Sequence, residues 1–208
     1  MDEKLRTVQQ VLKDYGRNPT QYPLHRSQKL LADFVLAATT EEKKRLRLNI
    51  NCSRNLFHVA VYFRDVQSIQ ILKTLLTDDQ ILALLGMKDI GGWDRFRGSL
   101  VGQNSKCLTP VLAAVLLWGA EGGDSKVYDE LIKDLPEDIR IRCLMAVDEQ
   151  CKNALRIACE TEDCEKRAVI KERIERDLKI SGKCSYKASK TETLCLCQLP
   201  RPLLRSIK

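Results

Sequence analysis

Aromatic side chains and histidine are scarce in this chain of 208 residues, at 5% of the residues and two residues respectively. Few aromatic residues beside plentiful Leu, Ile, Val and Ala are typical of thin helical layers. Histidine is the most common acid–base group in catalysis, and the sequence contains no Ser-His-Asp set, phosphate-binding loop or paired metal-ligand motif. We therefore expect no catalytic residue, no cofactor and no metal site.

Long apolar runs are also missing. The sequence has no stretch of 18 or more apolar residues, so we expect no membrane-spanning segment. The first ten residues contain acidic side chains and lack the apolar centre of a secretory signal, so none is expected. Without such a signal, nine cysteines are more typical of reduced thiols than of disulfides. These features predict a cytoplasmic protein, a nuclear protein, or one found in both compartments.

The net charge of +7 is concentrated at the two ends of the chain. Residues 1–50 carry 10 basic and 6 acidic side chains, and residues 179–208 carry 7 and 1, whereas residues 51–178 carry 18 and 21. A nucleic-acid-binding domain more often has a basic stripe across its folded body. Terminal Lys and Arg usually keep tails solvated, so direct binding to DNA or RNA is not expected.

Residues 55–76 have the pattern of two short helices joined by a turn. Phe57 and Val59 belong to the apolar start of the first helix, and Ile69 and Leu72 lie at helical spacing on the second. Each helix then has an apolar face that nothing inside the unit can cover. Such a unit requires stacked neighbours, which predicts that the pattern repeats along the chain.

The opening of this unit does recur, with spacings of 33, 54 and 44 residues. The first two copies contain the two histidines, and the third contains a Thr-Pro pair. The four copies open with Tyr22-Pro23-Leu24-His25, Asn55-Leu56-Phe57-His58, Thr109-Pro110-Val111-Leu112 and Asn153-Ala154-Leu155-Arg156.

A 33-residue period with a Thr-Pro-Leu-His-x-Ala opening is the signature of ankyrin repeats, and residues 20–178 resemble that family. The resemblance implies an all-α fold, an ankyrin-like helical repeat solenoid with short hairpin loops and inserted short helices. It also implies structural roles for Thr109 and Pro110 in their repeat, and for His25 and His58, which would hydrogen-bond neighbouring loop backbone and tie one repeat to the next. The chain departs from the family at Arg64, where the family has the Gly that ends the first helix.

The chain divides into three parts on this interpretation. Residues 1–19 are expected to form an N-terminal capping helix, because the end of a repeat array needs a polar outer side. Residues 20–180 are expected to form about four degenerate repeats, with short extra helices after Thr77 and after Pro136. Residues 181–208 are expected to be a basic linker and an apolar tail that contains proline.

A Gly-rich insertion at residues 86–107 contains five of the ten glycines, which argues against a helix. Its centre places two aromatic residues among charged ones, and Trp and Arg are residue types that anchor interfaces. We predict that this centre binds a partner protein, the alternative being that its two aromatic residues cover the neighbouring helix. The predicted partner-binding residues are Trp93, Asp94, Arg95, Phe96 and Arg97.

The tail at residues 193–207 resembles two known motifs in part. Its Leu-Pro-Arg-Pro-Leu-Leu stretch is similar to the end of a SOCS box, and the same letters are similar to the opening of an F-box. Either resemblance implies recruitment of a ubiquitin ligase, whereas an apolar tail that packs on the last repeat explains the same residues. The residues concerned are Leu194, Cys197, Leu199, Pro200, Pro202, Leu203 and Leu204.

The predicted function is non-enzymatic binding of a partner protein through the ankyrin-like loops and the concave helix face. One alternative is a substrate receptor of a cullin-type ubiquitin ligase, which would bind the ligase adaptor through residues 193–207. Another is an inhibitor of a transcription factor, resembling the inhibitor-of-kappaB group. All three share a rigid extended surface that loses little conformational freedom on binding.

Overall fold

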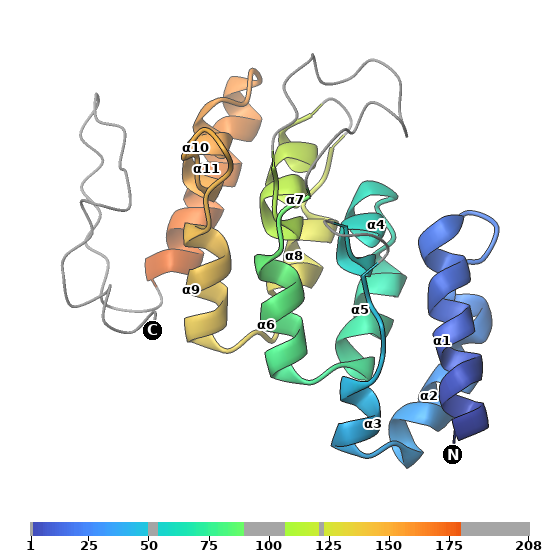
Figure 1. The fold of residues 1–208 in the computed structure, drawn as a ribbon. Coiled ribbons are helices and arrows are strands. Elements are labelled where there is room, and N and C mark those ends of the chain that lie inside the picture. The colour runs from blue at the N-terminus through green and yellow to red at the C-terminus, as the bar shows by residue number, and fades with distance from the viewer. Residues whose placement is uncertain (1, 50–53, 90–106, 121–122, 180–208) are drawn as a thin grey trace.

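The computed structural model describes residues 2–49, 54–89, 107–120 and 123–179 (Figure 1). Of these residues 70% are helical, and they include no β-strand, so the fold is all-α. In place of the expected hairpin loops, the described residues contain two isolated antiparallel bridges, between Asn49 and Asn55 and between Asp89 and Leu108.

The described chain contains eleven α-helices and one 3-10 helix, and most are short. In order they are α1 (Asp2–Arg17), η1 (Leu24–Ser27), α2 (Gln28–Ala37), α3 (Thr40–Lys44), α4 (Leu56–Tyr62), α5 (Val66–Leu75), α6 (Asp78–Gly86), α7 (Pro110–Gly119), α8 (Lys126–Ile132), α9 (Glu137–Met145), α10 (Ala154–Cys159) and α11 (Cys164–Lys179).

The helices pack against one another in three rows (Figure 1). In the first row α7 contacts α4 on one side and α10 on the other. In the second row α5 contacts α2 and α8. In the third row α6 contacts α9, and the Gln80 side chain of α6 donates a hydrogen bond to the Lys43 carbonyl of α3 at 3.0 Å. Successive units of the chain therefore lie side by side, and each covers its neighbour.

Side-chain caps fix where the first-row helices begin. Asn55 accepts hydrogen bonds from two backbone N–H groups at the start of α4, and Thr109 and Asn153 each accept one at the starts of α7 and α10. Such caps satisfy N–H groups that have no partner inside the helix. Pro110 follows the cap of α7, at a position where a missing N–H is not needed. These four residues occupy the openings of the second, third and fourth copies.

The centre of the array is α7, which is buried on nearly all sides. A helix apolar all round is stable only where other elements surround it, and α4, α8, α10 and α11 all contact it. Its buried residues are Pro110, Val111, Leu112, Ala113, Ala114, Val115 and Trp118.

Different helices cover the two ends of the array. At one end α1 packs on η1, α2 and α4, and it buries Leu5, Val8, Leu12 and Tyr15. At the other end α11 packs on α7, α9 and α10. Its inner side is apolar apart from the buried Asp177, whereas Glu172 and Arg176 form an exposed ion pair at 2.7 Å on its outer side. Both end helices therefore place an apolar side on the array and a polar side in solvent.

In the described part of the chain, every helix is too short or too polar to cross a lipid bilayer.

The junction between α4 and α5 has a left-handed backbone at Arg64, whose φ is 52°. This conformation disfavours residues that have a Cβ atom by about 1–2 kcal/mol. The position is the one where the ankyrin pattern has glycine, so the backbone there takes a conformation that suits glycine better than arginine.

We expect Arg64→Gly to be more stable than Arg64→Ala by about 1 kcal/mol, because only glycine relieves the strain at positive φ. Both variants remove the arginine side chain, so their difference isolates the backbone effect. The measurement is urea unfolding of the two variants. Equal stabilities, or a more stable alanine variant, would show that Arg64 is not strained.

Candidate functional site

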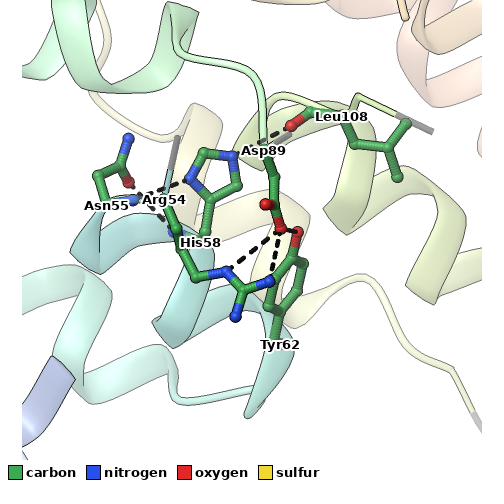
Figure 2. Close-up of polar contacts among 6 residues, drawn as sticks. All are labelled: Arg54, Asn55, His58, Tyr62, Asp89 and Leu108. Carbon is green, nitrogen blue, oxygen red and sulfur yellow. Dashed lines mark hydrogen bonds and ion pairs between the residues drawn. The ribbon is translucent and has the colours of Figure 1, made fainter. Parts of the chain in front are cut away.

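A polar cluster lies at the base of the Gly-rich insertion, in the otherwise apolar interior between α4, α6 and α7 (Figure 2). It joins the start of α4 to the residues on either side of segment 90–106. We call this cluster the insertion clamp, and its members are Arg54, Asn55, His58, Tyr62, Asp89 and Leu108.

Asn55 connects α4 to α6. Its side-chain oxygen accepts hydrogen bonds from the backbone N–H groups of Phe57 at 2.9 Å and His58 at 3.2 Å. Its side-chain amide donates to the Leu84 carbonyl of α6 at 2.7 Å. Asn55 is fully buried, and it both caps one helix and holds the next one against it.

His58 is fully buried and bonded through both ring nitrogens. Nδ1 accepts from the Asn55 backbone N–H at 3.4 Å, an arrangement that places the ring proton on Nε2. Nε2–H then donates to the Leu108 carbonyl at 3.1 Å. Burial lowers the pKa of His58 to about 4, so the imidazole is neutral at physiological pH. Its role in this geometry is to hold Leu108 beside the start of α4.

Asp89 is the common acceptor of the second half of the clamp. The Tyr62 hydroxyl donates to its carboxylate at 2.6 Å, and Arg54 donates from two guanidinium nitrogens at 3.0 and 3.3 Å. The guanidinium also lies over the Tyr62 ring, 5.4 Å from its centroid. Asp89 is only 3% exposed, and a buried carboxylate needs such charge-assisted donors to offset its loss of hydration.

The two halves of the clamp meet at the backbone. The Asp89 N–H donates to the Leu108 carbonyl at 2.9 Å, which forms the isolated bridge between these residues. The same carbonyl accepts from His58. Asp89 and Leu108, which flank segment 90–106, are therefore held next to each other and against α4.

Cys107 extends this base toward the loop before α10. Its thiol donates to the Glu149 carboxylate, with 2.6 Å between Sγ and Oε1. That hydrogen bond, with burial, raises the pKa of Cys107 to about 11, so the sulfur remains a neutral thiol. His58 has both ring nitrogens engaged by backbone groups, and it therefore cannot take a proton from Cys107 in this arrangement. The two residues do not form a nucleophile–base pair.

The repeat residues predicted from the sequence differ in how far the structure buries them. Thr109 and Pro110 lie buried at the start of α7, and His58 lies in the clamp. His25 differs from the expectation because its side chain is exposed, and no hydrogen bond joins its ring to the described loops. Its copy opens with the 3-10 helix η1 instead of an α-helix.

The predicted partner-binding and tail residues lie outside the described residues. They are Trp93, Asp94, Arg95, Phe96 and Arg97 in the insertion, and Leu194, Cys197, Leu199, Pro200, Pro202, Leu203 and Leu204 in the tail. In the part that the structure describes, no group of three or more His, Cys, Asp or Glu side chains could hold a metal ion.

Sequence reasoning missed three members of the clamp, Arg54, Tyr62 and Asp89. They come from two segments, α4 with the residues before it and the stretch after α6; Arg54 and Asp89 are 35 residues apart, and no short motif links them. One signal was present, because Tyr62 follows His58 by four residues and so lies on the same side of α4.

Comparison with family models, with curated proteins and with solved structures gave no match for this chain.

We predict that His58 makes the fold sensitive to acid. The unfolded chain binds this proton near the ordinary pKa of 6.5 and the folded chain only near 4. The stability contributed by neutral His58 is therefore complete above about pH 6.5, and about 3 kcal/mol of it is lost as the pH falls to about 4. Urea unfolding from pH 7.5 to 4 measures the loss.

His58→Gln removes the titrating group while an amide can still reach Leu108. Its stability should therefore fall less steeply than that of the native protein over this pH range. His25→Gln is the matched control, because His25 is exposed, and its curve should follow the native one. A curve for His58→Gln that runs parallel to the native curve would contradict the prediction.

We also expect Asp89→Ala to destabilise the protein by about 3–5 kcal/mol, because it removes the acceptor shared by two largely buried donors. Glu172→Ala breaks the exposed pair with Arg176 on α11 and should cost less than about 1 kcal/mol. Chemical denaturation of both variants makes the comparison. Similar effects of the two substitutions would mean that the clamp is not an important source of stability.

Proposed function

We propose that this chain is an ankyrin-like repeat protein that binds a partner protein non-covalently, without catalysing a reaction. The observation that best supports the proposal is the row of capped helices α4, α7 and α10, which begin at equivalent positions of the repeated opening. Stacked short helices give an extended surface whose shape is set before binding. A preformed surface loses little conformational entropy when a partner binds.

The insertion is the proposed contact region within this surface. The clamp supports this assignment, because it holds the flanking residues Asp89 and Leu108 side by side at a defined place on the array. Between those ends the sequence carries Trp93, Arg95 and Phe96, which are residue types that contribute much of the binding energy at interfaces. The rigid base would position the segment, and its anchoring side chains would bind the partner.

The ubiquitin-ligase alternative depends on a different part of the chain. It rests on the similarity of residues 193–207 to a SOCS box or an F-box, and it requires the array to hold a substrate while the tail recruits the adaptor. The principal proposal therefore predicts that a substitution in the insertion removes the partner. The alternative predicts that a deletion in the tail removes the ligase adaptor.

We expect Trp93→Ala with Phe96→Ala to remove the main partner of the full-length chain, with at least a tenfold loss of affinity, because interface anchors of this kind are worth several kcal/mol. The measurement is affinity capture from cells with mass spectrometry, followed by titration of the purified partner. Val169→Ser on α11 is the control, since this valine is 58% exposed and far along the chain from the insertion.

Deletion of residues 191–208 separates the alternatives. Under the principal proposal the deleted protein keeps its partner. Loss of a ligase adaptor alone, with the other partners kept, would favour the ubiquitin-ligase alternative. If the double substitution and the deletion both retained every partner, the assignment of the binding residues would be wrong.

A further inference from the structure

A groove of about 440 Å³ lies between α2 and α5, on the second row of helices. Its apolar part includes Ala32, Val35 and Leu36 of α2 and Ile71 of α5, and Gln28 and Gln70 are among its polar residues. None of the residues that line it is Lys, Arg, Asp or Glu. In a protein with 30% charged residues, such a groove favours an occupant that is apolar and uncharged.

An apolar side chain stands at one end of the same groove. Leu36, near the end of α2, is 87% exposed, more than any other large hydrophobic residue described as exposed. Gln28, at the start of α2, lies toward the other end. The face therefore presents both an apolar projection and an apolar recess. An interface between two identical copies related by a two-fold axis requires this kind of self-complementary surface.

The charges beside the groove fit the same arrangement. Lys29 and Asp33 are both exposed on α2 and lie one helical turn apart. If two copies of α2 cross in antiparallel directions about residue 31, Lys29 of each copy faces Asp33 of the other. The Lys-before-Asp order is the weaker orientation for a pair within one helix, so little pairing within the helix is lost when the two charges face a second copy. One Lys29–Asp33 ion pair would then lie on each side of the two-fold axis, with no charged residue between the two pairs.

We propose that the α2–α5 groove is the interface of a two-fold symmetric dimer of this chain. In it, α2 of each copy lies antiparallel to the other, and each Leu36 enters the Gln28 end of the facing groove. A ten-residue helix is about 15 Å long, so the contact belongs to the small, transient class of interfaces. The dimer forms at micromolar concentrations, because the net charge of +7 on each copy opposes a tighter one. It is independent of the insertion clamp, which lies on α4, α6 and α7.

Sedimentation velocity of the full-length chain tests the dimer, in reducing buffer so that disulfides between the nine cysteines do not contribute. From about 1 to 500 µM, the weight-average mass should rise from that of one chain toward that of two. Leu36→Glu should remain a monomer at every concentration, because it places a charge in the apolar contact between Leu36 and the facing groove. Val169→Glu, the same kind of change at an exposed position on α11, should behave like the native chain.

A charge exchange tests the antiparallel register. Lys29→Asp and Asp33→Lys should each weaken dimerisation about tenfold, and the double variant should return to within about threefold of the native value. A native chain that stays monomeric throughout would overturn the proposal. Dimers that persist in Leu36→Glu, or a double variant without recovery, would overturn it as well. Circular dichroism of each variant verifies the fold, which these exposed positions should not disturb.

Discussion

The structure depends on the burial of apolar helix faces that no single helix pair can cover. Most of the helices have ten residues or fewer, and isolated helices of that length are marginal in water. Each becomes stable only when its neighbours in the same row and the adjacent row lie against it. α7 is the clearest case, because its surroundings are other helices on nearly every side.

Buried tyrosine–aspartate contacts recur at the places where this apolar packing is interrupted. Tyr15 of α1 donates to Asp65 at 3.4 Å, Tyr62 of α4 to Asp89 at 2.6 Å, and Tyr128 of α8 to Asp177 of α11 at 2.7 Å. Each pair joins segments that are distant in sequence. A phenol fills apolar space with its ring and satisfies a carboxylate with its hydroxyl, so these contacts fix neighbouring segments in one orientation where apolar packing alone is less specific.

Local signals made part of this structure predictable. Thr77 and Pro136 mark the starts of α6 and α9, because capping and the geometry of a first turn depend only on nearby residues. The insertion clamp was not predictable in the same way, since Asp89 meets Arg54 and Tyr62 only after the segment that follows α6 has packed against α4. His25 shows the limit of a repeated motif: its copy has a histidine at the same position as that of His58, but it opens with a 3-10 helix and the side chain is exposed.

The bridge between Asp89 and Leu108 has a consequence for protein engineering. Paired residues in an antiparallel bridge have Cα atoms about 5 Å apart, so the packing of the flanking helices does not depend on the number of residues between Asp89 and Leu108. A foreign domain whose termini are adjacent could be grafted between positions 89 and 108 while the surrounding helices keep their places. The chain would then serve as a scaffold for displaying other proteins.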